Sequence, residues 1–154
     1  MSFAAALAVL DAHLVTAGAT LAEPNTITDV SAGEPGVPTG KCARYWYEGD
    51  GVPARMGGQR TLADQMTGER ITVRLYWPVS TRDKRIAAAL EAAVQAAARA
   101  VKHALIADST LGGNCTDMEV GDADAGWLLL DSSTWRTLTI PLTLDFVDLD
   151  TIGA

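Results

Sequence analysis

The order of hydrophobic patterns along the chain predicts an α+β fold, in which one mainly antiparallel sheet packs with two helices. Apolar residues recur at helical spacing near the N-terminus and again in a long alanine-rich segment over residues 81–107. Segments of alternating apolar residues, typical of strands, lie between these helices and after the second one. The 154 residues suffice for one hydrophobic core, so we expect a single domain over residues 1–154.

The N-terminal segment is predicted to be an amphipathic helix followed by a connector. Ser2 is a suitable N-cap and Gly18 a suitable end. One face of this helix carries Phe3, Leu7, Leu10 and Leu14. Residues 19–40 are rich in Pro, Gly and Thr, which predicts a connector that holds at most a short strand near residues 27–30.

Two strands with a long insertion between them come next. Residues 41–47 are rich in aromatic side chains, and residues 70–77 alternate between apolar and polar ones. The intervening residues 49–68 contain four glycines between Gly49 and Gly58. A loop of this length in a compact domain is usually functional, so we expect the insertion to be held by another protein chain.

The second helix is predicted to run from Thr81 to Ala107, with Ser80 or Thr81 as its N-cap. Its buried stripe is expected to consist of Ile86, Leu90, Val94, Ala97, Val101 and Leu105. A narrow polar stripe on the opposite side contains Lys84, Glu91, Gln95, Arg99 and Lys102.

The C-terminal part is predicted to form an antiparallel meander. Turns at 111–113 and 131–134 flank short strands around 118–120 and 127–130, and a long strand follows over 138–146. Pro141 lies within this last strand and has no backbone N–H to donate. Because proline cannot donate to a ladder, we expect this strand to lie at a sheet edge or to be bulged.

The charge is unevenly distributed, which bears on the partners of the protein. The formal net charge is −7. Residues 41–102 hold 11 basic and six acidic side chains, whereas residues 103–154 hold one basic and nine acidic ones. This balance disfavours a protein whose main task is to bind nucleic-acid phosphates. It favours a chain that presents opposite charges on different surfaces.

The sequence also predicts the compartment. Cys42 and Cys115 have no nearby second cysteine, which favours two reduced thiols in a cytosolic protein over a zinc site or a disulfide. The apolar N-terminal run is interrupted at Asp11 and has no basic residue before it, which disfavours an export signal. No apolar run approaches the length needed to cross a membrane.

No motif in the sequence predicts catalysis, a cofactor or a metal. Residues 33–42 only partly resemble a phosphate-binding loop, because Pro35 and Cys42 stand where glycine and a hydroxyl residue are needed. No nucleophile elbow is present, and His13 and His103 are expected on helices away from the two cysteines. We therefore expect the protein not to be an enzyme.

Two clusters permit a binding interpretation, and each also has a structural one. The acidic residues 117–124 lack calcium-loop spacing and favour a solvated acidic hairpin. The aromatic residues on the two central strands, with arginines beside them, are compatible with single-stranded nucleic acid or with simple filling of the core. The acidic net charge favours the core. These aromatic residues are Tyr45, Trp46, Tyr47, Tyr76 and Trp77.

The order of segments resembles the tail terminator (tail completion) proteins of long-tailed bacteriophages. The resemblance covers Ser2 to Asp148 and depends on three segments. These are the strand Arg70–Trp77, the alanine-rich helix that ends in the sequence His103–Gly113, and the closing strand Arg136–Phe146. The chain departs from the family pattern in its connector 19–40 and its insertion 49–68.

The resemblance implies a structural virion protein that assembles in the host cytoplasm. Such a protein forms a ring, usually a hexamer, at the head-proximal end of the tail tube. The ring ends tube polymerisation and joins the head-proximal neck protein. Genome DNA passes through it without specific binding, and no membrane is involved. Acidic residues around the channel would keep DNA from adhering.

Two sets of residues are candidates for these roles. The candidate subunit-interface residues are Lys84, Arg99, Lys102, Asp50, Arg55 and Arg60, and the candidate channel-facing or solvated acids are Asp117, Glu119, Asp122 and Asp124. Two alternatives stay open: another neck protein, such as a stopper or adaptor, and a small ligand-binding or enzyme domain. Ring symmetry tests the first, and a deep polar pocket around His13 or His103 would favour the second.

Overall fold

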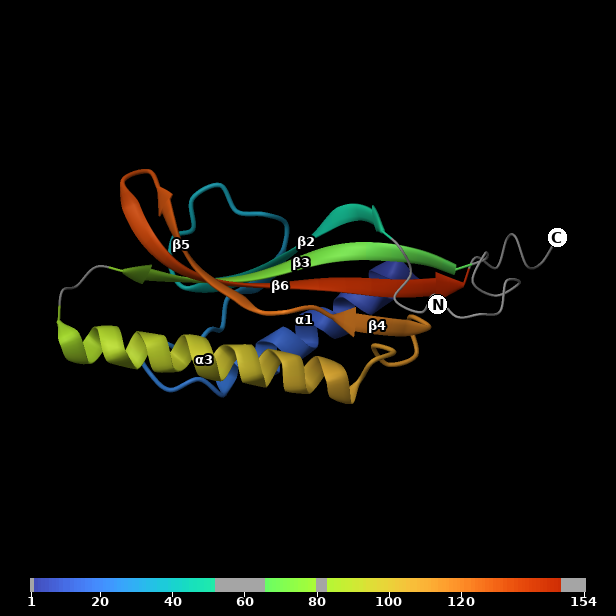
Figure 1. The fold of residues 1–154 in the computed structure, drawn as a ribbon, viewed down its shortest axis with the longest axis horizontal. Helices are drawn as coiled ribbons and strands as arrows, with labels where there is room; N and C mark the ends of the chain where they lie inside the picture. The colour runs from blue at the N-terminus through green and yellow to red at the C-terminus, as the bar shows by residue number, and fades with distance from the viewer. Residues whose placement is uncertain (1, 52–65, 80–82, 148–154) are drawn as a thin grey trace.

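A computed structural model describes residues 2–51, 66–79 and 83–147 of the chain. It confirms the predicted α+β fold: six strands form one mostly antiparallel sheet, and two helices cover one of its faces (Figure 1). The strand order is β1-β2-β3-β6-β4, and β5 also pairs with β6. The elements are α1 (Phe3–Ala19), β1 (Val30–Ala32), β2 (Cys42–Gly51), β3 (Met66–Val79), α3 (Lys84–Ala107), β4 (Asp117–Val120), β5 (Asp124–Leu130) and β6 (Ser133–Val147).

Helix α1 begins where its sequence predicts and ends at Ala19, one residue after the predicted end at Gly18. The Ser2 hydroxyl accepts a hydrogen bond from the Ala5 backbone amide at 3.1 Å, which caps the first turn. At the other end, a Cβ on Gly18 would lie 2.5 Å from the Ile27 carbonyl oxygen. Glycine is therefore required here, because the connector folds back directly against the helix and donates from the Ile27 amide to the Gly18 carbonyl at 3.1 Å.

Strands β2 and β3 pair antiparallel, as the sequence predicts, and β3 lies at the centre of the sheet between β2 and β6. The ladder runs from Cys42↔Tyr76 to Gly51↔Gly68 and contains a bulge between Tyr47 and Gly49. The short strand β1 pairs in parallel with β2 at the edge. Residues 52–65, the larger part of the predicted insertion, lie outside the described residues.

Strand β6 lies inside the sheet, so the prediction that Pro141 marks an edge strand is wrong. One side of β6 pairs with β3 along its whole length, from Thr134 to Val147. The other side pairs with two strands in turn, β5 over Ser133–Thr139 and β4 over Leu142–Asp145. Pro141 occupies the step between them, and its carbonyl accepts from Gly121 at 2.8 Å. The backbone N and C=O of one strand residue face the same neighbouring strand. The Pro141 nitrogen, which carries no hydrogen, therefore faces the connection between the end of β4 and the start of β5.

The C-terminal strands also do not form the predicted meander. β4 and β5 pair with β6 at opposite ends of that strand (Figure 1). The acidic segment 117–124 is therefore not a hairpin. Only β5 and β6 form one, through a turn at Asp131 and Ser132 with φ of 48° and 65°. Positive φ at both turn residues matches the twist of an antiparallel hairpin.

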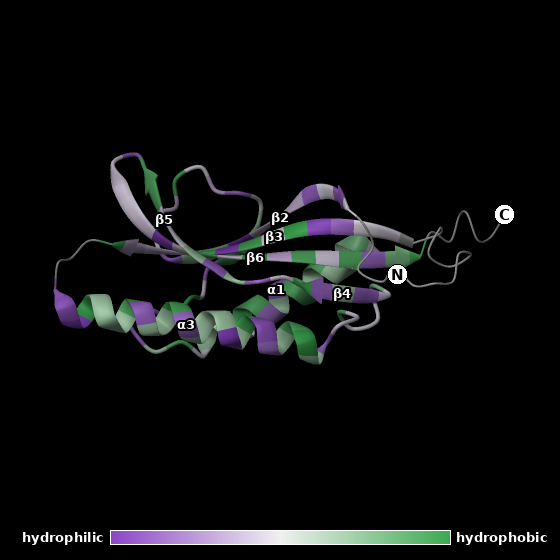
Figure 2. Cartoon of the chain, in the orientation of Figure 1, coloured by the Kyte–Doolittle hydropathy of each residue, from purple (hydrophilic) through white to green (hydrophobic). Residues whose placement is uncertain are grey.

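Helix α3 begins later than its sequence predicts. Its N-cap is Asp83, whose carboxylate accepts from the Arg85 amide at 2.8 Å, in place of Ser80 or Thr81. Hydrophilic and hydrophobic residues alternate along this helix (Figure 2). The predicted buried stripe is confirmed from Leu90 to Leu105, but Ile86 is 49% exposed because the first turn extends beyond the sheet it covers.

The main core lies between the helices and the sheet. Alternate residues of β3 and β6 point toward the helices and are fully buried there, Ile71, Val73, Leu75, Leu138, Ile140, Leu142 and Leu144. Removing this apolar surface from water contributes about 25 cal/mol per Å² to folding. A smaller cluster of Cys42, Tyr76 and Trp135 lies on the other face of the sheet.

Candidate interaction surfaces

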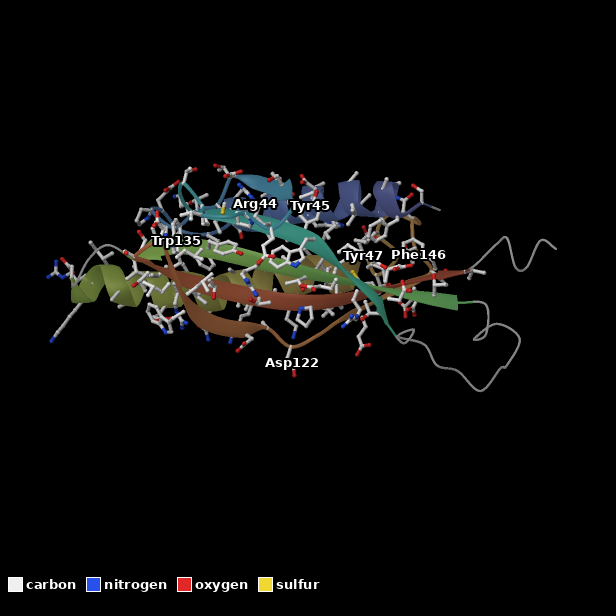
Figure 3. All side chains as sticks on the ribbon, turned by 90° about the horizontal axis from the view of Figure 1, so that it is seen from above. Arg44, Tyr45, Tyr47, Asp122, Trp135 and Phe146 are labelled. Carbon is white, nitrogen blue, oxygen red and sulfur yellow. The ribbon has the colours of Figure 1, made fainter. Side chains whose placement is uncertain are left out.

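The sheet face that the helices leave uncovered carries a network of polar side chains (Figure 3). Glu48 accepts from the Trp46 indole at 2.7 Å and from the Thr72 hydroxyl at 2.9 Å. These two hydrogen bonds hold the pKa of Glu48 below its usual value, with the Thr72 bond as the larger cause. The guanidinium of Arg74 lies 5.3 Å from the Trp46 ring centre and donates to the Thr139 hydroxyl at 2.9 Å. The network therefore links three neighbouring strands.

The arginines on this face are engaged within the subunit. Arg44 forms an ion pair with Asp29 at 2.9 Å, and its hydrogen bond lowers the pKa of that carboxyl. Arg70 donates to the backbone carbonyls of Asp50 at 3.1 Å and Glu48 at 3.3 Å. Tyr45 and Trp77 are buried in the main core. Both observations favour a structural role for the aromatic cluster over nucleic-acid stacking.

The thiols and histidines do not form a catalytic pair. Burial raises the pKa of Cys42 and raises that of Cys115 to about 11, so both are protonated and weakly nucleophilic at neutral pH. His13 Nε2 lies 2.8 Å from Asp108 Oδ2, which ties α1 to the end of α3. His103 is exposed on α3. Among the described residues, no group of His, Cys, Asp and Glu has the arrangement of a metal site.

A tyrosine–carboxylate cluster lies beside the bulge in β2. The Tyr47 hydroxyl donates to Asp50 Oδ1 at 2.8 Å, and the Tyr47 ring packs edge-on against Phe3 of α1 at 5.7 Å between ring centres. Hydrogen bonding to Glu69, and then to Asp50, raises the pKa of Tyr47. The predicted interface residue Asp50 is therefore bound within its own subunit.

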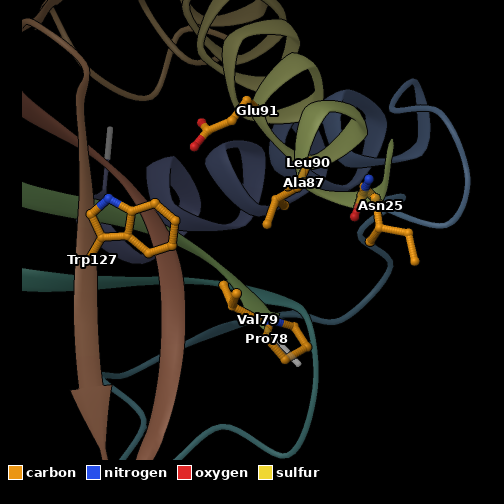
Figure 4. A pocket seen from close by; sticks show the side chains of 8 residues that line it. Asn25, Pro78, Val79, Ala87, Leu90, Glu91 and Trp127 are labelled. Atoms are coloured by element: carbon orange, nitrogen blue, oxygen red, sulfur yellow. The ribbon is translucent and has the colours of Figure 1, made fainter. Parts of the chain in front are cut away.

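An apolar groove opens between the first turns of α3 and the β5–β6 hairpin (Figure 4). Its lining includes the apolar side chains of Pro78, Val79, Ile86, Leu90 and Trp127. The described part of the chain exposes seven large hydrophobic side chains. Three of them gather here: Trp127 and Ile86 line the groove, and Leu129 follows Trp127 on the same face of β5, with exposed fractions of 59%, 49% and 69%. We call Ile86, Trp127, Leu129 and this groove the apolar patch. Exposed apolar surface concentrated in this way is typical of sites that bind another molecule.

Trp127 is held in place within this patch. The Arg136 guanidinium lies 4.5 Å from the Trp127 ring centre. Arg136 in turn forms an ion pair with Glu91 of α3 at 2.9 Å and donates to the Gly126 carbonyl at 2.9 Å. An aromatic ring fixed in this way loses little conformational freedom when a partner binds. Rigid tryptophan and arginine side chains are also the types enriched at the energetic centres of protein interfaces.

The predicted basic interface residues are only partly brought together. Lys84 lies at the start of α3 and Arg99 farther along, and both are exposed, while Lys102 is half-buried. Asp50 lies at the far side of the sheet on β2. Arg55 and Arg60 lie outside the described residues.

The four predicted acids lie along one edge of the sheet. Asp117 and Glu119 are on β4, Asp122 is in the connection after it, and Asp124 begins β5. Glu119, Asp122 and Asp124 are exposed, and Asp117 is half-buried. Figure 3 places Asp122 at the edge opposite α1.

The apolar patch is not among the sites predicted from the sequence, although the sequence of β5 contains a signal for it. The four consecutive apolar residues 127–130 place apolar side chains on both faces of β5. Leu128 and Leu130 pack on the smaller cluster, which leaves Trp127 and Leu129 on the other face. A short strand that is apolar on both faces needs a cover on each.

Comparison of the chain with protein-family models and with curated protein sequences gives no match. No helix in the described ranges is both long enough and apolar enough to cross a bilayer.

Proposed function

We propose that the protein is a ring-forming structural protein of a phage virion, located at the head-proximal end of the tail tube. The observation that carries this proposal is the apolar patch, a preorganised and exposed hydrophobic surface suited to contact with a protein chain. The order of segments resembles that of tail terminator proteins, and this resemblance is the reason for proposing a phage tail as the assembly.

The charges of the described residues are compatible with this role. The acids of β4, the following connection and β5 form a negative edge, with Glu119, Asp122 and Asp124 exposed. Placed toward the channel of a ring, this edge would repel DNA phosphates and let the genome pass without adhering. The partners are then a second copy of this chain, the tail tube protein and the head-proximal neck protein.

Electron micrographs of the purified protein, together with tube polymerisation in its presence, test the proposal. We expect sixfold rings that stop the growth of tail tubes at a uniform length. A twelvefold ring that leaves tube length unchanged would instead favour an adaptor of the neck. A protein that remains monomeric in solution and within its native particle would overturn the proposal.

A further inference from the structure

The outward face of α1 carries no charge, which is unusual for a surface helix. The exposed side chains of this helix are Ala4, Ala8, Ala12, Val15, Thr16 and Ala19. The two titratable side chains of α1 are both directed to other elements: Asp11 accepts from the Tyr45 hydroxyl at 2.8 Å, and His13 contacts Asp108. A helix that is apolar all round is normally covered on all sides. We call this set of exposed residues the α1 face.

The α1 face and the apolar patch lie at opposite edges of the subunit. α1 packs beside β1, at one end of the strand order, whereas β5 pairs with β6 near the other end. Figure 3 shows α1 along one edge of the sheet and the β4–β5 edge along the other. One subunit therefore cannot cover its own patch with its own α1 face.

We infer that the apolar patch of one subunit binds the α1 face of the next copy of this chain. The α1 face offers small side chains against which the exposed Trp127 and Leu129 can pack, in the manner of a helix docked on an apolar groove. The inference rests on the proposed function in so far as both require self-association.

Charge complementarity favours α1 over the other exposed helix as the occupant. The charged residues nearest Trp127 are Glu91 of the groove lining and Arg136, whose guanidinium lies over the Trp127 ring, and these two are already paired with each other at 2.9 Å. The Trp127 side of the groove therefore fits a partner that brings no unpaired charge. The α1 face meets this condition, whereas the outward surface of α3 carries Lys84, Arg85 and Arg99 among its alanines.

The position of the two surfaces also determines the symmetry of the contact. Because the surfaces differ and lie at opposite edges, each copy uses its patch toward one neighbour and its α1 face toward the other. Such a heterologous contact gives a closed ring when the rotation per subunit divides a full turn, and a filament when it does not. Two-fold dimers do not arise from this contact.

Substitutions on each surface, alone and mixed, test the inference. Val15→Arg places a charge on the α1 face, and Leu129→Arg places one on the patch. Val37→Arg is the matched control, because Val37 is 52% exposed, close to the 43% of Val15, and belongs to neither surface. All three positions are exposed, so thermal unfolding should show that each variant folds. Sedimentation velocity measures the assembly state.

Each of the two surface variants alone should be monomeric, with self-association weakened at least about 30-fold, while Val37→Arg assembles as wild type does. An equimolar mixture of Val15→Arg and Leu129→Arg should form a heterodimer that grows no further. In that heterodimer, the intact patch of the first variant binds the intact α1 face of the second.

The outcomes separate the inference from the proposed function. If both surface variants form wild-type rings, or if their mixture gives no heterodimer, the inference is overturned, and rings that still end tube growth leave the function standing. If the heterodimer forms but the wild-type protein does not stop tube growth, the contact is correct and the function is wrong. A wild-type protein that stays monomeric at all concentrations would overturn both.

Discussion

At the residue scale, Asp108 joins the two helices at a point the sequence does not reveal. It follows the last residue of α3, and its carboxylate accepts from the Gly112 amide at 3.0 Å and contacts His13 of α1 at 2.8 Å. These hydrogen bonds, with Gly112 as the larger cause, hold the pKa of Asp108 below its usual value of 3.8. The ionised carboxylate thus stabilises both the turn after α3 and the packing of the helices.

Asp108→Asn should lower the free energy of unfolding by about 1–2 kcal/mol at pH 7, because two hydrogen bonds to a charged group are weakened. A carboxyl with a depressed folded-state pKa contributes stability above its unfolded pKa and loses it as the pH falls through the folded value. The difference between variant and wild type should therefore shrink below about pH 4. Urea denaturation at pH 7 and pH 3 measures it.

Asp122→Asn is the control for this substitution. Asp122 is exposed in the connection between β4 and β5, so its substitution should change stability by less than about 0.5 kcal/mol at both pH values. An Asp108→Asn protein as stable as wild type at pH 7 would show that the contacts of Asp108 do not stabilise the fold.

At the element scale, β6 organises the sheet, and its proline is accommodated by its neighbours. The step from β4 to β5 beside Pro141 depends on Gly121, at which a Cβ would lie 2.7 Å from the Pro141 ring and 3.1 Å from its carbonyl oxygen. The proline ring and the glycine therefore pack directly against each other, and there is no room for a larger side chain at either position.

Gly121→Ala should lower the free energy of unfolding by about 1–3 kcal/mol through this overlap. Pro141→Ala removes the ring atom at 2.7 Å and should recover part of that loss in the double variant. Thermal or urea unfolding of the two single variants and the double variant measures the coupling. Strictly additive losses would show that the two side chains do not contact each other.

The β2–β3 ladder indicates how the fold should respond when the insertion between these strands is shortened. Gly51 and Gly68 are paired, so a short turn can replace residues 52–65 without disturbing the ladder. Replacing 52–65 with Asn-Gly should change the free energy of unfolding by less than about 1 kcal/mol, because loop length affects stability weakly. If the insertion docks on another chain, tail joining in an infection assay should be lost. An unfolded variant would instead assign these residues to the core.

At the scale of the whole molecule, charge and apolar surface have separate tasks in the proposed ring. The α1 face and the apolar patch are uncharged or internally paired, and they would supply most of the affinity. Lys84 and Arg99 on α3 and the acidic β4–β5 edge remain on the surface. Exposed charges of this kind alter association rates more than affinities.

Arg99→Glu together with Lys102→Glu should slow ring assembly while thermal unfolding of the subunit stays nearly unchanged. Exposed ion pairs contribute only about 0–1 kcal/mol each, so folding is little affected. The corresponding double substitution with Gln should slow assembly less. Raising salt to about 1 M should slow wild-type assembly too, because the screening length falls to about 3 Å. Stopped-flow light scattering measures the rates, and rates unaffected by salt and by both variants would show that these charges take no part.

The sequence by itself determined which segments become helices and strands. Local signals decide these: the Ser2 cap, the helical spacing from Leu90 to Leu105, and the alternation along β3 and β6. Each signal needs only residues close in the chain, because backbone hydrogen bonds and side-chain periodicity act over short distances. The α+β class followed from the order of these segments.

Only the tertiary structure decided how the strands are ordered and which apolar side chains stay uncovered. Pro141 predicted that β6 is an edge strand, yet β4 and β5 each pair with part of the same side of β6. The surroundings of Pro141 therefore depend on residues about 20 positions away in the chain. Ile86 has the helical spacing of a core residue and still emerges beyond the sheet. Trp127 and Leu129 stay exposed, and Trp127 lines a groove together with the first turns of α3. Burial is a property of what packs against a residue, and the local sequence does not contain that information.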